Sequence, residues 1–307
     1  MILYKLIFGR VEKKNRRDAE DVAESYIGVL LHNGQACGEY FTVVREGNLI
    51  AYVNLQGIRA QSLEYHSKYG MKELKKVTDL FGKPPEWILV DDDAPKRDTT
   101  WTKARFLYLF THMNDWESPL CRGDNGKRIP LYRLPGTHED REAIYFWQRT
   151  YRKYDEIWVG CGELEIPVYK QLADPSSELS QKGRDICRGV EKVTGVPAYY
   201  FLMRYWGRRR GEDKRACPGC GRPWRSNHPV DHPRGWWQFA FQCPSCRLVS
   251  HIADSYDDER HAVIGEYKKQ RERTTAVYQR NQIARNANER FIKSGIKIRD
   301  VYGKLAE

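Results

Sequence analysis

Two closely spaced pairs of cysteines constrain the fold of this chain more than any other feature. The pairs, separated by twenty-two residues, are Cys217, Cys220, Cys243 and Cys246. Each C-x-x-C pair predicts a tight turn with two thiolates on one side of the chain, and Gly219 and Gly221 are expected to supply positive φ angles there. Two facing turns would form a tetrahedral sulfur cage that suits Zn²⁺, with Zn–S distances near ~2.3 Å. Four thiolates leave no open coordination position, so the spacing predicts a structural rather than a catalytic metal.

Other uses of the same cysteines remain as alternatives. A tetrahedral set of four sulfurs also accepts iron, as in rubredoxin-like proteins. Redox-active thiols are a further alternative. Disulfides would fit an oxidising setting, but the chain is expected in a reducing cytoplasm. Met1–Phe8 lacks a basic leader and a small-residue cleavage site, and no apolar run approaches the ~20 residues of a membrane span. We therefore predict a cytoplasmic protein without a membrane partner.

The positive charge is concentrated in one part of the chain. Of the net charge of +11 over 307 residues, residues 1–203 carry +1, residues 204–250 carry +7 and residues 251–307 carry +3. A basic excess confined to one module is typical of a surface that binds a polyanion, with a solubilising surface as the alternative. The charge therefore predicts DNA or RNA as a partner of the cysteine-rich segment.

Nine of the ten basic residues in that segment are arginines, which bind phosphate bidentately and stack on bases. The candidate phosphate contacts are Arg208, Arg209, Arg210, Lys214, Arg215, Arg222, Arg225, Arg234 and Arg247. Trp224 and Trp236 are candidates for stacking on unpaired bases. Packing against the metal site is the alternative role for these two rings.

Short strands are expected around the cysteines. Within residues 236–242, the large apolar residues Trp237, Phe239 and Phe241 alternate with Gln238, Ala240 and Gln242. Residues 247–252 leave the second cysteine pair as another strand. Pro229 and Pro233 indicate a loop between the two tryptophans. We therefore predict a zinc ribbon over residues 207–254, which is too short to fold without its metal.

At this point the motifs resemble a bacterial family of unknown function that is described as containing a zinc ribbon and as a candidate nucleic-acid binder. The segments that carry the resemblance are residues 177–183, 196–205, 217–224 and 239–250. The resemblance covers about residues 140–252. It implies zinc on the four cysteines and a role with nucleic acid, and it implies no reaction and no catalytic residues.

The chain before the ribbon predicts an α+β fold. Residues 1–100 show the order strand, helix, strand, strand, helix, strand, which is typical of a ferredoxin-like sandwich. The expected elements are residues 2–11, 16–31, 39–45, 48–54, 71–81 and 86–90. Residues 101–206 predict a second α+β region. Its expected strands are 104–111, 129–134 and 197–205, and its expected helices are 139–154 and 176–194. Residues 255–307 predict a basic helical arm that either docks on the body or contacts a partner.

Three functions follow from these features. The first is non-catalytic binding of nucleic acid through the arginine-rich zinc ribbon. The second is a scaffold whose ribbon docks on an acidic protein. The third is a metal-dependent nuclease that uses Asp91–Asp93, which follow an expected strand, although a solvated loop explains these acids as well. Because the chain contains no glycine-rich phosphate loop and no nucleophile elbow, we expect a binding protein rather than an enzyme.

Overall fold

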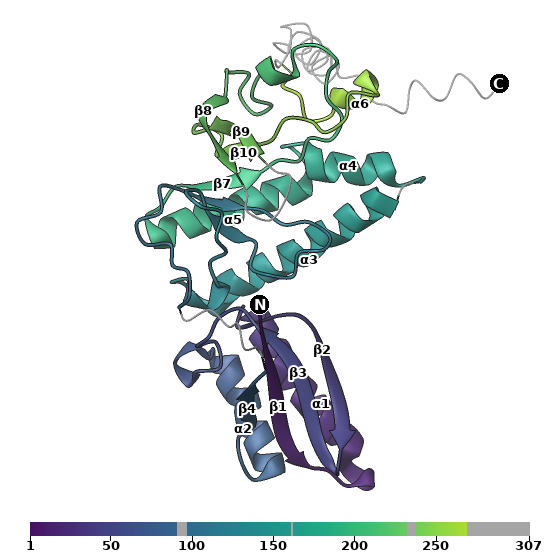
Figure 1. The fold of residues 1–307 in the computed structure, drawn as a ribbon, viewed down its shortest axis with the longest axis vertical. Helices are drawn as coiled ribbons and strands as arrows, with labels where there is room; N and C mark the ends of the chain where they lie inside the picture. The colour runs from purple at the N-terminus through teal and green to yellow at the C-terminus, as the bar shows by residue number, and fades with distance from the viewer. Residues whose placement is uncertain (91–96, 161, 232–237, 269–307) are drawn as a thin grey trace, which may run out of the picture. The chain divides into compact units, whose positions relative to one another are not determined.

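The computed structural model describes residues 1–90, 97–160, 162–231 and 238–268 (Figure 1). In these residues the chain forms two β-sheets with helices packed against them, so the predicted α+β class is confirmed. None of the helices in the described ranges combines the length and apolar character that crossing a membrane requires.

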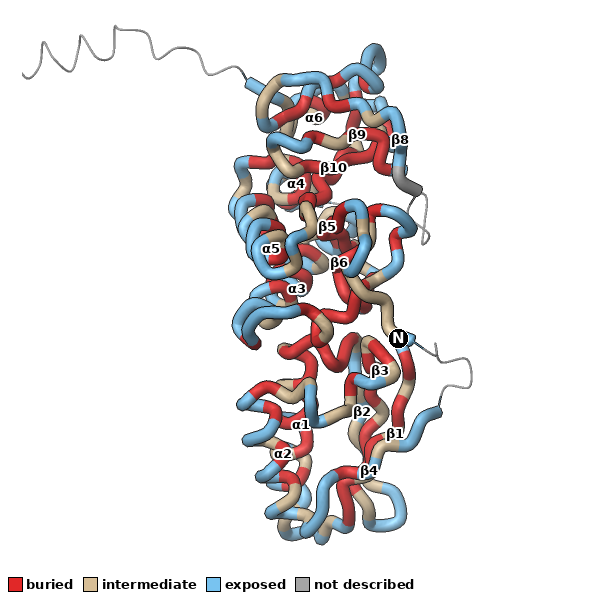
Figure 2. The backbone as a smooth tube through the Cα atoms, turned by 90° about the vertical axis from the view of Figure 1, so that its left-hand side faces the viewer, coloured by how far each residue is buried: buried red, intermediate tan, exposed pale blue. Residues whose placement is uncertain are grey.

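The first sheet belongs to the N-terminal region. Its elements are β1 (Ile2–Arg10), α1 (Arg16–His32), β2 (Ala36–Arg45), β3 (Asn48–Leu55), α2 (Lys68–Phe81) and β4 (Glu86–Leu89). The strand order is β2-β3-β1-β4, and all neighbouring strands are antiparallel. Alternate residues of β1, including Tyr4, Leu6 and Phe8, are buried. The helices α1 and α2 cover one face of this sheet (Figure 2).

Helix α2 begins three residues before the predicted start at residue 71. The Ser67 hydroxyl accepts a hydrogen bond from the Gly70 amide at 3.1 Å, which satisfies one of the free amides of the first turn. The helix ends at Gly82, whose φ of 75° closes the last turn in the left-handed conformation. The predicted end is thus correct, and the capping serine explains the earlier start.

The second sheet combines strands from residues 101–206 with strands from residues 207–254, the segment predicted as a ribbon and called the ribbon below. The strands are β5 (Leu107–Leu109), β6 (Leu120–Arg122), β7 (Ala198–Phe201), β8 (Arg225–Asp231), β9 (Gln238–Cys243) and β10 (Leu248–Ser250). Their order is β6-β5-β7-β10-β9-β8. Since β10 pairs with β7 in parallel, the ribbon strands extend the sheet of the second region. The accompanying helices are α3 (His138–Gly160), α4 (Glu165–Ala173), α5 (Glu178–Thr194) and α6 (Glu259–Ala262).

One hydrophobic core runs through this second sheet. Phe110 and Phe201 make an edge contact with ring centroids 4.8 Å apart, and Phe201 lies 5.4 Å from Phe239 of β9. Trp224, just before β8, and Phe241 of β9 belong to the same core. The N-terminal region has a separate core between its sheet and its two helices. The ribbon therefore packs as part of the second region.

Several local expectations are wrong. Residues 129–134 contain a 3-10 turn (Leu131–Arg133) instead of a strand, because Pro130 has no amide to donate to a ladder. The expected loop after Trp224 contains strand β8, which tolerates Pro229 because it lies at the edge of the sheet. Helix α4 was not predicted. Most of the expected helical arm lies outside the described residues, and the described part of it contains α6.

Candidate metal centre

The four paired cysteines come together as their spacing predicts. Their sulfur atoms all lie within 4.8 Å of one another, and the sulfurs of Cys220 and Cys243 are 3.7 Å apart. Four sulfurs that are each ~2.3 Å from a central ion stand ~3.8 Å from one another. All four thiols are free of disulfides. The cluster therefore has the composition and the size of a tetrahedral thiolate site.

The two turns hold their cysteines with similar backbone geometry. In the first turn, Gly221 donates a hydrogen bond to the Cys217 carbonyl at 2.8 Å. The residue after the second cysteine takes a left-handed conformation in both turns, with φ of 73° at Gly221 and 52° at Arg247. The expectation of positive φ at Gly219 is wrong. That position requires glycine for another reason, since a Cβ there would lie 2.8 Å from the Cys246 sulfur.

The thiols differ in acidity. Burial raises the pKa of the Cys217 thiol and raises that of Cys246 to about 12. Against the effect of burial, hydrogen bonds from the backbone and side chain of Arg222 lower the pKa of Cys220 to about 6. Four adjacent thiolates would repel one another, which opposes the deprotonation of all four without an ion. A bound divalent cation would remove that repulsion and favour deprotonation of all four.

A buried network of ion pairs involves residues just before the first cysteine turn. Arg204 and Arg215 both pair with the Glu212 carboxylate, at 3.2 and 2.8 Å. Arg215 also donates to the Ser250 hydroxyl at 2.8 Å and to the His251 carbonyl at 3.0 Å. Burial, followed by repulsion from Arg204, lowers the pKa of Arg215 to about 10. Arg215, one of the predicted phosphate contacts, is therefore an internal residue that joins the ribbon to the segment after β10.

Two further predicted contacts are held by carboxylates. Arg208 forms a two-point ion pair with Glu266, which also binds Arg204 at 2.9 Å. Arg247 pairs with Glu191 of α5 at 2.6 Å. Sequence reasoning missed these carboxylates, because no local pattern indicates that Glu191 and Glu266 lie beside arginines more than fifty residues away. The positive charge of the ribbon is therefore partly neutralised by carboxylates of the same chain.

Trp224 is not available to stack on a base in this structure. The side chain is 3% exposed, and its ring lies against Phe241 with centroids 5.1 Å apart. Its indole nitrogen donates to the Arg215 carbonyl at 2.9 Å. The Arg215 guanidinium lies 4.8 Å from the ring centre, so both polar and aromatic parts of the tryptophan have partners. Of the two roles predicted for Trp224, the structure places it in the packing role.

The remaining predicted contacts in the described chain are exposed. They are Arg209, Arg210, Lys214, Arg222 and Arg225. Arg222 follows Cys220 by two residues and its interaction with that thiol lowers the thiol pKa, so positive charge and the sulfur cluster are adjacent. Arg234 and Trp236 lie outside the described residues, as do Asp91–Asp93 of the nuclease hypothesis.

Comparisons with known proteins agree with the resemblance to a family of unknown function. Three family models match, each described as a domain of unknown function: DUF8589 over residues 1–91, DUF2310 over residues 101–203 and DUF8594 over residues 207–256. No solved structure matches the chain.

Two uncharacterized proteins of Haemophilus influenzae are similar to this chain. The first is 32% identical over 165 residues, which cover 53% of this chain and 59% of that protein, so the match spans less than two thirds of that relative. The second is 32% identical over 168 residues, which cover 54% of this chain and 80% of that protein. At this identity and coverage, the chain belongs to the same protein family as the second Haemophilus influenzae protein.

Proposed function

We propose that the protein is a zinc-dependent, non-catalytic nucleic-acid-binding protein of the cytoplasm, which contacts phosphates through the exposed basic residues beside its cysteine cluster. The observation that carries the proposal is the cluster itself, with sulfurs within 4.8 Å of one another and Arg222 beside Cys220. Zinc is proposed over iron because closed sites of four thiolates are the usual structural zinc sites.

The charge balance supports a phosphate partner. Residues 204–250 carry +7. Four thiolates with one Zn²⁺ carry −2 together, which leaves +5 on the metal-bound segment. The ion pairs that Arg208, Arg215 and Arg247 form with carboxylates of the same chain use part of this charge. The contacts would therefore come from the five exposed residues Arg209, Arg210, Lys214, Arg222 and Arg225, and binding would release counterions and weaken with salt.

The proposal includes the layout that the sequence predicts. The order β-α-β-β-α-β and the strand order β2-β3-β1-β4 support a ferredoxin-like sandwich at residues 1–100. Strands β8, β9 and β10 with the four cysteines support a zinc ribbon at residues 207–254. Within this layout the ribbon supplies the binding face, and the second region holds it through the shared sheet.

A gel shift with the metal-loaded full-length chain tests the proposal. Single-stranded and double-stranded DNA and RNA are titrated at about 50 and about 200 mM salt. The double variant Arg209→Ala, Arg210→Ala is expected to bind more weakly, with a salt slope lower by about 1 for each lost phosphate contact. The matched control Lys170→Ala, Lys192→Ala removes the same charge from exposed positions on α4 and α5, and should bind as the wild type does.

Failure to shift any of these nucleic acids at the lower salt concentration would reject the proposal. In that case an acidic protein that stays bound after nuclease treatment would favour the scaffold function. Metal analysis of the same preparation separates zinc from iron. A folded, metal-free chain would reject the zinc-dependent part independently of the binding result.

A further inference from the structure

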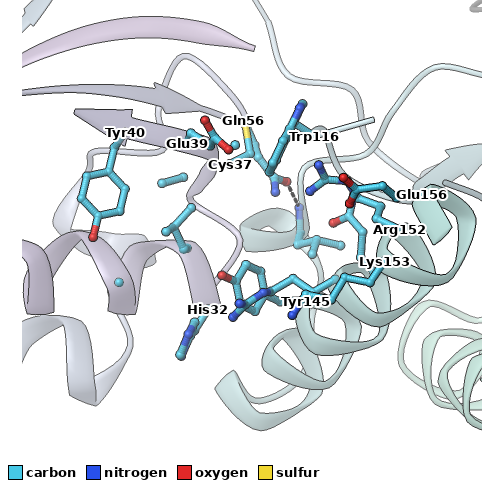
Figure 3. Close-up of a pocket in the computed structure, with 17 residues that line it drawn as sticks. His32, Cys37, Glu39, Tyr40, Gln56, Trp116, Tyr145, Arg152, Lys153 and Glu156 are labelled. Atoms are coloured by element: carbon cyan, nitrogen blue, oxygen red, sulfur yellow. Dashed lines mark hydrogen bonds between the residues drawn. The ribbon is translucent and has the colours of Figure 1, made fainter. Parts of the chain in front are cut away.

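A second candidate site lies far along the chain from the cysteine cluster. A cavity of about 600 Å³ opens where the end of α1, the start of β2 and the middle of α3 meet (Figure 3). Its lining combines basic and aromatic side chains and includes none of the four clustered cysteines. Small-molecule sites commonly have volumes of roughly 300–1,000 Å³ and lie between structural units. The volume of the cavity is sufficient for a small molecule.

Hydrogen bonds and an ion pair between distant segments fix the walls of this cavity. The Met1 amino group pairs with Glu117 at 2.6 Å. The Leu131 amide donates to the Gln56 side chain at 2.9 Å, a contact that is drawn in Figure 3. In addition, Arg141 of α3 donates to the side chain of Asn33, the residue after α1, at 2.9 Å. A cavity held open by contacts between elements does not need to form when a ligand arrives.

One wall of the cavity is basic. Arg149, Arg152 and Lys153 occupy positions i, i+3 and i+4 of α3, so they lie on the same side of the helix. Among the residues that the structure describes, no carboxylate forms an ion pair with any of the three. The Arg152 guanidinium lies 3.2 Å from the centre of the Trp116 ring, and its Nε donates to the Met113 carbonyl at 3.2 Å. These contacts hold the planar guanidinium in place and leave its terminal nitrogens without hydrogen bonds in the described chain. An arginine held this way suits a bidentate contact with phosphate.

The remaining walls are aromatic. Tyr40 projects from β2, at a bulge where the pairing with β3 shifts register. Trp116 packs over Gly38, whose φ is 74° and whose Cβ would lie 3.6 Å from Trp116 Cβ. On the α3 side, the Tyr145 ring lies 4.9 Å from that of His32. Flat rings at several edges of one cavity favour a ligand that contains a planar group.

We propose that this cavity binds a mononucleotide, with its phosphate on Arg149, Arg152 and Lys153 and its base among Tyr40, Trp116 and Tyr145. Two acids, Glu39 and Glu156, also line the cavity and reduce its positive charge. Three cations and two carboxylates favour a ligand with a small negative charge over a polyphosphate, and the carboxylates can accept hydrogen bonds from ribose hydroxyls or base amino groups. This site is separate from the ribbon and does not depend on the proposed nucleic-acid binding.

Isothermal titration calorimetry of the metal-loaded full-length chain tests this site. The probes are AMP, GMP, CMP and UMP, with the matching nucleosides and inorganic phosphate as partial ligands. At least one mononucleotide is expected to bind one per chain, at least tenfold more tightly than its nucleoside and than phosphate. Absence of binding by all four mononucleotides would overturn the proposal, and so would phosphate that binds as tightly as the best mononucleotide.

Variants locate the binding. Lys153→Met and Arg149→Met change exposed side chains of α3 and are each expected to weaken mononucleotide binding about tenfold. Lys192→Met makes the same kind of change at an exposed position of α5 and should leave binding unchanged. The ribbon variant Arg209→Ala, Arg210→Ala should also leave it unchanged. Loss of mononucleotide binding in that variant would assign the bound nucleotide to the ribbon and overturn the proposal.

A variant that fills the cavity provides a test independent of charge. Gly28 of α1 lines the cavity, and a Cβ at this position would meet no atom within 4 Å. Gly28→Leu should therefore fold, with a better helix former in α1, and should abolish mononucleotide binding. Circular dichroism and metal content verify the fold. Wild-type affinity in a folded Gly28→Leu protein would place the nucleotide elsewhere and contradict the proposal.

Discussion

Some arginines of the ribbon form buried ion pairs and others are exposed, and residue type alone does not distinguish the two groups. Arg215 is buried between Glu212 and the rings of Trp224 and Phe241. Arg209, six positions earlier, is exposed. An ion pair that is buried neutralises its charge within the fold, whereas an exposed arginine can still attract phosphate. The number of basic residues in such a module is therefore larger than the number that can bind phosphate, because some of them are paired with carboxylates.

At single residues, the first prediction concerns the metal ligands. Cys220→Ser removes one sulfur from the cluster and should reduce the bound metal from one ion per chain to well below one, because oxygen is a poor replacement for a thiolate on Zn²⁺. Metal analysis of the purified variant measures this loss. Cys187→Ala serves as the control. That thiol is buried in α5, so its removal should cost about 1–2 kcal/mol of stability without changing metal content. Equal metal content in all three proteins would exclude the four-cysteine site.

A second prediction at this scale is a pH dependence from His251. Burial, followed by repulsion from Arg215 and Arg204, lowers the pKa of His251 to about 3. An unfolded histidine titrates near ~6.5. Since the folded state binds fewer protons in this interval, the stability that is present above pH 6.5 is lost as the pH falls toward 3. The loss approaches about 1.4 kcal/mol per pH unit within the window.

Urea unfolding at about pH 7.5 and about pH 5.5 measures this dependence. The stability of the wild type relative to His251→Gln should fall by about 1 kcal/mol between the two pH values. The comparison uses the difference between proteins, so acid effects that both share cancel. His228→Gln, at an exposed position of β8, should follow the wild type. A His251→Gln protein with the wild-type pH dependence would show that His251 is not the titrating group.

At the scale of elements, periodic segments could be predicted and long-range pairings could not. The strand at residues 2–11 and the helix at residues 16–31 match β1 and α1 within one residue, because their apolar periods are continuous. The four cysteines were likewise found from spacing alone. Strand β8 was missed because its proline is tolerated only at an edge, and the edge is defined by partners far away in sequence. The burial of Trp224 and Arg215 depends on the same distant partners.

The contact between α5 and β7 gives a third prediction. Gly183 faces β7, where an added Cβ would overlap the Tyr200 ring and lie 2.9 Å from Trp147 Nε1. Gly183→Ala should therefore destabilise the protein by about 2 kcal/mol. Gly189 of the same helix has no atom within 4 Å of an added Cβ, so Gly189→Ala should stabilise by up to about 1 kcal/mol. Chemical denaturation of both variants measures the two changes, and similar effects at both positions would contradict this packing of α5.

At the scale of the whole molecule, the shared sheet determines which parts of the structure a bound metal ion would stabilise. The ribbon strand β10 pairs with β7, and Phe239 of β9 packs with Phe201 and with Tyr108 of β5. A metal ion bound by the four cysteines would therefore support the edge of a larger core. Within the described ranges, the N-terminal sheet has a core of its own and shares no strand with the second sheet. Loss of the metal should consequently affect the two sheets differently.

Hydrogen exchange before and after removal of the metal by a chelator tests this fourth prediction. Amides of β8, β9 and β10 should lose protection first, because the cysteine turn before β8 and the one between β9 and β10 lose their common ligand. Amides of β7 should lose part of their protection, since β7 then has one ordered neighbour, β5, in place of two. Amides of β1 and β3 should keep their protection. Exchange that stays unchanged in β8 to β10 would mean that packing alone holds the ribbon, and equal loss in β1 would mean that the two cores unfold together.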